Sequence, residues 1–165
     1  MLNKKKGQLL SQPFIYIFML VVIGLLLFFG FRVIKNFMSV TKDVEFVKFV
    51  NDFEDEIELY YDLDIGSSKI IDAPVGNEIM YTCFVDRDGK IDYSIAPDKR
   101  AGDLMRAAIG KNVFFISYPT LKEREAVYIK HIRPEGKNPL CIRTINKLKA
   151  KIESKGKYVS ISEVK

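Results

Sequence analysis

A cluster of acidic residues in the middle of the chain has the residue types that bind a hard cation. Asp86, Asp88 and Asp92 stand close together around Gly89, and calcium loops supply several carboxylate oxygens at such short spacing. The glycine, however, comes earlier than in a calcium loop. Pro97 occupies the twelfth position, where a glutamate would hold the ion through two oxygens. We therefore expect no metal site and interpret Asp88-Gly89 as a hairpin turn.

The remaining titratable residues do not form a catalytic arrangement. His131 is the single histidine and lies on the apolar face of an expected strand, which favours a role in the core or at its boundary. Glu123 and Glu125 could share acid and base work only in a site shielded from water, and they fall in an expected loop. We predict no catalytic residues, no cofactor and no enzymatic activity, and we identify no small-molecule substrate.

The two cysteines, Cys83 and Cys141, have no partners at the spacing of metal ligands. Each stands among apolar residues of an expected strand, so both thiols should point toward a core. We predict a disulfide between them, which requires an oxidising compartment. The alternative is a pair of buried free thiols. Redox catalysis is disfavoured because catalytic dithiols usually form a CxxC motif.

The elements that must position these residues are mostly short strands. Each expected strand is apolar and is separated from the next by turn residues. A short helix is expected from Ala101 to Ile109, with Asp98 before it and Gly110 after it. The strands are expected at Lys69 to Val75, Ile79 to Val85, Ile91 to Ile95, Asn112 to Tyr118 and Ala126 to Ile132.

The C-terminal stretch fits two patterns. Residues 141–154 have apolar positions that suit a helix, yet part of the stretch alternates and leads into a Lys155-Gly156 turn. We favour strands here. The final alternation around Val159 and Ile161 predicts that the domain ends on a strand, at an edge of the sheet.

The N-terminal region is apolar enough to cross a membrane. Residues 13–31 contain no charge, and a helix of this length spans about 28 Å, the thickness of a bilayer's hydrocarbon layer. A globular domain of this size could hardly surround a helix that is apolar on every face. A cleaved secretory signal is the alternative, but no small-x-small cleavage site follows the run.

The helix should continue beyond the membrane. Residues 32–63 contain no glycine or proline, and apolar residues recur three or four positions apart from Val33 to Tyr60. This amphipathic stalk is acidic: from Asp43 to Asp64 nine acidic residues face one lysine, a net charge of −8. From Ile65 onward 19 Lys and Arg face 12 Asp and Glu, a net charge of +7. Fields of opposite sign can attract the two regions or neighbouring subunits.

The stretch KKKGQLLSQPFIYIF, residues 4–18, resembles the class III signal peptide of archaeal type IV pilin-like proteins. The resemblance implies that a basic leader is removed on the cytoplasmic side, with Gly7 as its last residue and Gln8 as the first of the mature chain. It also implies that the apolar helix remains as anchor and assembly core for copies of the chain or other pilin-like subunits. Gln12 stands where many members have glutamate.

The orientation of the chain in the membrane is predicted from the disulfide and the leader more than from the charges that flank the span. Three lysines precede the span, and Arg32, Lys35 and Lys42 follow it, so the charge rule is nearly balanced. The predicted disulfide and the leader both favour a cytoplasmic N-terminus and an extracytoplasmic C-terminal domain. The predicted organisation is a basic flank (1–12), a transmembrane helix (13–31), a stalk (32–63) and a head (64–165).

The predicted fold class is α+β: a long N-terminal helix followed by a small, mainly antiparallel β-sheet domain with one short helix. We expect a single-pass, non-enzymatic envelope protein, a pilin-like subunit. The alternative is a membrane protein that does not polymerise and whose head binds an envelope partner. Nucleic acid is not an expected partner, because the basic residues of the head are dispersed and belong to no binding motif.

Overall fold

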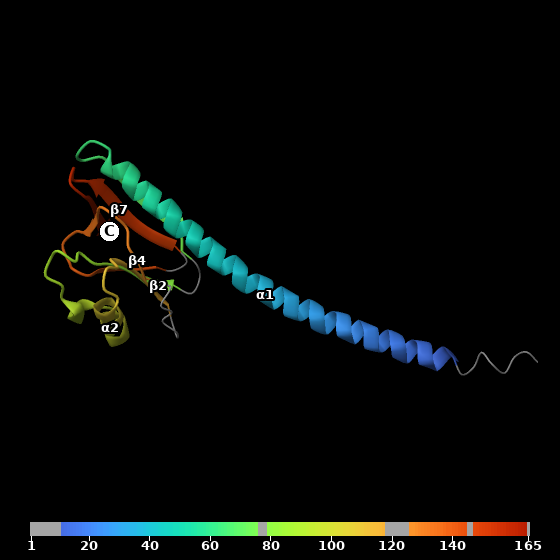
Figure 1. The fold of residues 1–165 in the computed structure, drawn as a ribbon. Helices are drawn as coiled ribbons and strands as arrows, with labels where there is room; N and C mark the ends of the chain where they lie inside the picture. The colour runs from blue at the N-terminus through green and yellow to red at the C-terminus, as the bar shows by residue number, and fades with distance from the viewer. Residues whose placement is uncertain (1–10, 76–78, 118–125, 145–146, 165) are drawn as a thin grey trace, which may run out of the picture. The chain divides into compact units, whose positions relative to one another are not determined.

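A single long helix forms the N-terminal part of the protein. The computed structural model describes residues 11–75, 79–117, 126–144 and 147–164, apart from the side chains of residues 11–12 and 35–43. Helix α1 (Ser11–Tyr61) has 51 residues (Figure 1). The prediction of one uninterrupted helix is confirmed. The chain divides after Asp43 into two compact units, so the last part of α1, from Val44, belongs to the second unit.

The second unit contains two four-stranded sheets, where the sequence analysis expected a single β-sheet domain. All neighbouring strands are antiparallel except β5 and β8, which are parallel. The α+β class and the mainly antiparallel pairing are thus confirmed. The first sheet has the order β1 (Ser68–Pro74), β7 (Lys147–Ser154), β8 (Val159–Glu163), β5 (Ile132–Pro134). The second has the order β4 (Ala126–Val127), β3 (Val113–Ser117), β2 (Ile79–Phe84), β6 (Leu140–Arg143).

The C-terminal part of α1 closes the main core of the second unit. Phe49, Phe53 and Ile57 recur every four residues, so they lie on one helix face, and all three are buried in a cluster that includes residues of both sheets. Phe53 packs on Phe84 of β2, and Phe49 packs edge-on against Phe115 of β3, with ring centroids 6.1 Å and 5.9 Å apart. Each such buried side chain contributes about 1.5–3 kcal/mol.

The apolar stripe of the helix is placed differently from the expectation. Val44 and Val47, which the periodicity assigned to the apolar stripe, are exposed. Phe46 and Phe49 contact Phe115 instead. Two apolar stripes overlap in this part of the sequence, and the aromatic one faces the core because its rings bury more area.

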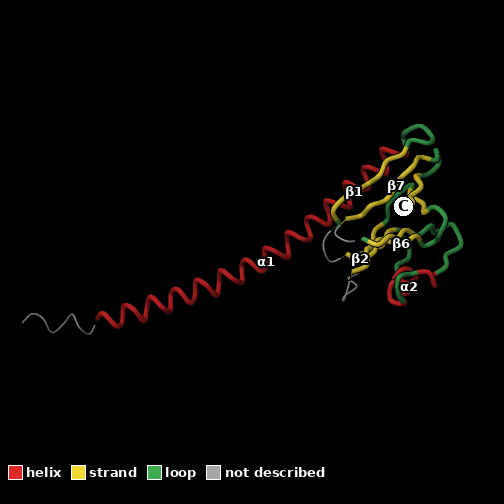
Figure 2. Tube along the Cα trace, turned by 180° about the vertical axis from the view of Figure 1, so that it is seen from behind, coloured by secondary structure: helices red, strands yellow, loops and turns green. Residues whose placement is uncertain are grey.

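Strand β3 lies between α1 on one side and α2 (Lys99–Ala107) on the other. All five of its residues are buried. Phe115 faces α1, whereas Phe114 belongs to a second cluster with Met105 of α2. In Figure 2 α2 lies on the far side of β2 and β6 from the C-terminal part of α1. Asp98 is the N-cap of α2, as predicted, and its Oδ1 accepts a 2.7 Å hydrogen bond from the Ala101 amide.

The prediction of a strand at 91–95 is wrong. Tyr93–Ile95 form a short 3₁₀ helix, η1, with Asp92 as its N-cap. The Asp92 carboxylate accepts hydrogen bonds from both the amide and the hydroxyl of Ser94, at 3.0 Å and 2.6 Å. Such local bonds give the backbone an alternative to a sheet ladder. Because no strand follows, Asp88-Gly89 is not a β-hairpin turn.

The strand expected at 126–132 is divided between the two sheets. Only β4, Ala126–Val127, pairs with β3, and β5 joins β8 in the other sheet. In the segment between β4 and β5, the buried side chain of Asn112 forms the hydrogen bonds that a neighbouring strand would otherwise form. Its Nδ2 donates to the Ile129 carbonyl at 2.7 Å, and its Oδ1 accepts from the Ile129 amide at 2.8 Å. The side-chain amide of Asn112 therefore ends the pairing of β4 with β3 after two residues.

The C-terminal strands are confirmed, but the predicted edge position is wrong. Residues 141–154 form β6 and β7 rather than a helix. A turn with Gly156 at φ 79° follows, and it leads into β8. Strand β8 pairs with β7 on one side and with β5 on the other, so it lies inside its sheet. Its parallel partner is β5, which begins where the single strand expected from Ala126 to Ile132 was predicted to end.

Candidate functional site

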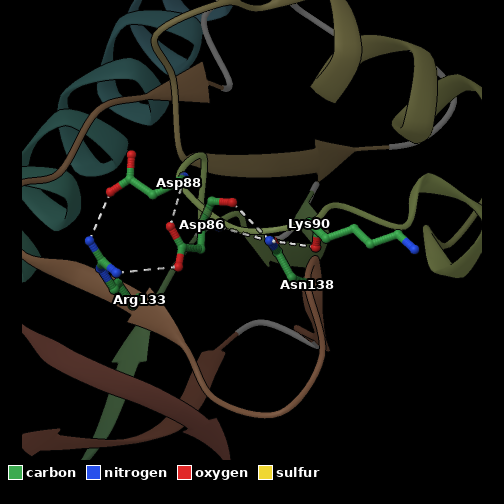
Figure 3. A network of polar contacts seen from close by, with 5 residues as sticks. All are labelled: Asp86, Asp88, Lys90, Arg133 and Asn138. Atoms are coloured by element: carbon green, nitrogen blue, oxygen red, sulfur yellow. Dashed lines mark hydrogen bonds and ion pairs between the residues drawn. The ribbon is translucent and has the colours of Figure 1, made fainter.

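The acidic loop that follows β2 is closed by an arginine rather than left open for a cation. Arg133 of β5 donates to Asp88 Oδ2 at 2.8 Å, and its other terminal nitrogen lies 3.7 Å from Asp86 Oδ2 (Figure 3). Asp86 Oδ1 also accepts a 3.0 Å bond from the Asp88 amide. The guanidinium thus neutralises two carboxylates that the sequence analysis compared with a calcium loop.

Asn138 fixes the path of the same loop. Its Nδ2 donates to the carbonyls of Asp86 and Lys90 at 2.8 Å and 3.2 Å, and its Oδ1 accepts from the Asp86 amide at 2.9 Å. A cis peptide bond joins Asn138 to Pro139. These bonds hold 86–90 as a turn without strand pairing (Figure 3). The sequence analysis missed Asn138, and its position before a proline was the one available signal.

Arg87 points away from the acidic loop and holds the C-terminal end of α2. It donates to three carbonyls, those of Lys111, Met105 and Ala108, at 2.7 Å, 2.8 Å and 2.9 Å. Carbonyls at a helix C-terminus lack intrahelical partners and carry partial negative charge, so a cation there is stabilising. Arg87 has a structural role that the sequence pattern did not indicate.

His131 was expected in the core or at its boundary, and it lies at the boundary, because its side chain is exposed and stacks on a residue that packs against the core. The residue occupies a turn with φ 62° instead of a strand. Its ring stacks on Tyr61 at the end of α1, with centroids 3.7 Å apart and planes within 14°. It therefore borders the core from outside. Glu123 and Glu125 lie outside the described residues.

Cys83 and Cys141 form a disulfide. They occupy directly paired positions on β2 and β6, so the bond joins neighbouring strands. Cys83 is fully buried and Cys141 partly buried. The pairing predicted from the apolar surroundings of the two residues is confirmed, and the bridge closes a 58-residue separation.

The first unit contains a helix segment that is long and apolar enough to cross a membrane. Pro13–Ile34 has 22 residues with a mean hydropathy of 2.8, and none of its length is buried against the protein. Large apolar side chains such as Phe14, Leu20 and Phe28 are exposed along it. A surface of this kind is typical of a helix that contacts lipid or another protein. The predicted cleavage residues Gly7 and Gln8 lie outside the described residues.

The second unit carries an acidic helix face, which we define as Asp52, Asp55 and Glu58 with Leu59 among them. All four residues are exposed. In the described part of 44–61, Glu56 is the one acidic residue in an ion pair, at 2.7 Å from Lys69 of β1. That hydrogen bond raises the pKa of Lys69. The acidic helix face therefore presents carboxylates without cationic partners.

Strand β7 carries a face of opposite charge, which we define as the lysine face: Lys147, Lys149 and Lys151, with Ile70 of β1 beside Lys151. Alternate residues of β7 are buried, so these lysines point away from the core. Lys147 pairs with Asp72 at 3.2 Å. Lys149 is exposed.

Glu153 ends the lysine face. It accepts hydrogen bonds from Lys151 and Lys155 at 2.7 Å and 2.6 Å. These bonds, together with the positive charges of the two lysines, lower the pKa of Glu153 to about 2.

No group of three or more His, Cys, Asp or Glu side chains that could hold a metal occurs among the described residues. No protein-family model matches the chain, and no curated protein or solved structure matches it significantly. The features available for a functional argument are therefore the exposed apolar helix, the disulfide and the two charged faces.

Proposed function

We propose that this chain is a non-enzymatic, membrane-anchored envelope protein, a pilin-like subunit with an extracytoplasmic head. The observation that carries the proposal is the exposed apolar segment Pro13–Ile34, whose first residues belong to the stretch 4–18 that resembles a class III signal peptide. An apolar helix of this length is stable in a bilayer and is costly in water. In the proposal it serves both as anchor and as the surface along which subunits assemble.

The disulfide supports an extracytoplasmic head. Cys83 and Cys141 are bonded, and such bonds persist in oxidising compartments but are rare in the cytosol. A head outside the cytoplasm places the N-terminus inside, where a leader peptidase of the proposed kind would act. The flanking charges do not oppose this orientation, since three lysines precede the span and Arg32, Lys35 and Lys42 follow it.

A second candidate is a single-pass protein that does not polymerise and whose head binds an envelope partner. One residue favours it: Gln12 stands where many pilin-like proteins have glutamate. An uncharged residue there would remove an ionic contact between subunits without affecting membrane insertion.

The deciding experiment is the intact mass of the protein extracted from native membranes without reductant. The proposal requires loss of residues 1–7, through cleavage between Gly7 and Gln8, and loss of two hydrogens at the disulfide. A Gly7→Val variant serves as the control, because a bulky residue at the cleavage site should block processing. A full-length chain with both thiols free would contradict the proposal.

A further inference from the structure

The two charged faces of the second unit point away from the same core. The acidic helix face is on the side of α1 opposite Phe49, Phe53 and Ile57, which are buried. The lysine face is on the side of β7 opposite Leu148 and Ile152, which are buried in that same core. One copy therefore cannot place its own acidic helix face on its own lysine face.

The faces match in size and in composition. Asp52 to Leu59 extends about 10 Å along the helix axis, and Lys147 to Lys151 extends about 14 Å along the strand. Each face has one exposed large apolar residue among its charges, since Leu59 is 55% and Ile70 is 53% exposed. Contact between two such faces would join charges of opposite sign and remove both apolar side chains from water.

We propose that the acidic helix face of one copy docks on the lysine face of a second copy. Different patches then meet, so the contact is heterologous, and repetition of it gives an open chain or a closed ring. This inference adds a contact between heads to the assembly described under the proposed function, but it does not depend on leader cleavage. Lys149 lies at the centre of the contact, because it is exposed and its neighbours Lys147 and Lys151 already have partners in the same copy.

The test is cross-linking between labelled and unlabelled copies. Full-length protein with and without heavy-isotope labelling is reconstituted as an equal mixture in phospholipid vesicles. A carbodiimide then joins carboxylates to amines that are in direct contact. We expect mixed-isotope peptides that connect the segment containing Asp52, Asp55 and Glu58 to β7. Links within one copy carry a single isotope and are excluded.

Charge reversal makes the test specific. Asp55→Lys with Glu58→Lys, or Lys147→Glu with Lys149→Glu, should each reduce the mixed-isotope link about tenfold, because like charges then oppose each other. An equal mixture of the two double variants should restore links between unlike copies, since each reversed face meets a complementary one. Lys99→Glu with Arg100→Glu, on exposed positions of α2, is the matched control and should leave the link unchanged.

The outcomes separate this inference from the proposed function. Mixed-isotope head links on an uncleaved chain would support the docking and contradict the pilin-like assignment. Assembly through the anchor helix with no link between heads would overturn the docking alone. The docking would also be overturned if the mixed double variants failed to restore the link. It would be overturned as well if anionic lipid, instead of a second copy, protected the lysines of the lysine face.

Discussion

At the scale of single residues, two arginines stabilise the loop that follows β2 and the end of α2. Arg133 lies between Asp86 and Asp88, and Arg87 closes the end of α2. Both are charge-assisted contacts, which are stronger than neutral hydrogen bonds. An aspartate-rich stretch that resembles a cation site is therefore a structural joint between β2, α2 and β5.

Replacement of Arg87 by alanine should destabilise the second unit. The change leaves the carbonyls of Met105, Ala108 and Lys111 without their donor, and a lost bond to a charged group costs about 1.5–3 kcal/mol. Chemical denaturation of the full chain in detergent should show a fall of that size. Arg100→Ala, at an exposed position of α2, is the control and should change stability by no more than about 0.5 kcal/mol. Equal stability of the two variants would contradict this role for Arg87.

Glu153 should make stability depend on acidity. Its pKa is about 2 in the folded protein, against a usual value of 4.5, because Lys151 and Lys155 hydrogen-bond to the carboxylate. A lowered folded-state pKa stabilises the protein above the unfolded value, and the benefit is lost as the pH falls through the folded value. The difference in Tm between the protein and Glu153→Gln should therefore be constant near neutral pH and shrink from about pH 4.5 to about pH 2.

The same Glu153 comparison has a built-in control. Glu163→Gln, at an exposed position of the neighbouring strand β8, is the matched control and should change the Tm little at any pH. Raised salt should weaken the Glu153 effect, because the group is partly exposed. A pH-independent Tm difference for Glu153→Gln would contradict the assignment.

At the scale of elements, the sequence was informative where apolar periodicity and turn residues agreed. Strands β1, β2 and β3, helix α2 with its Asp98 cap, and α1 as one helix all follow from such local patterns. The disulfide was also predictable, because both cysteines stand among apolar strand residues.

The remaining elements depend on contacts between distant residues. The short apolar segment 91–95, bounded by turn residues, indicated a strand, but the Asp92 carboxylate bonds locally to Ser94. The ladder at 126–132 ends because Asn112, which immediately precedes β3, hydrogen-bonds to the backbone groups of Ile129. The Arg133 contacts with the acidic loop join positions 45 residues apart. No pattern within one segment reports such contacts.

The disulfide between β2 and β6 should be a major source of stability for the second unit. A bridge between cysteines at a sequence separation of 58 removes chain entropy from the unfolded state worth about 4 kcal/mol. Reduction should therefore lower the unfolding free energy by about that amount in denaturant titrations of the full chain. A Cys83→Ala, Cys141→Ala double variant should be insensitive to reductant. Identical curves for the oxidised and reduced protein would show that the bridge does not restrain the unfolded chain.

At the scale of the whole molecule, the two units have opposite solvent requirements. The segment 13–34 exposes apolar side chains along its length, whereas the second unit buries a core and carries charged faces. This contrast was readable from composition alone, because it needs no long-range contact. The sequence also indicated that oppositely charged regions could attract neighbouring subunits. It did not indicate the two faces of the proposed docking, since these depend on which residues of β7 and α1 the fold turns outward.

Two arginines in the middle of the apolar segment should release the protein from membranes. Ile23 and Leu26 are one helical turn apart near the centre of Pro13–Ile34, and each central arginine opposes insertion by about 2.5–3.5 kcal/mol. The Ile23→Arg, Leu26→Arg variant should shift from the membrane pellet to the supernatant after alkaline carbonate extraction. Val44→Arg with Val47→Arg, equally spaced and exposed on the same helix but in the second unit, should stay in the pellet. If both double variants behave alike, Pro13–Ile34 does not anchor the chain; if only the first is released, the anchor is that segment and the second unit lies outside the bilayer.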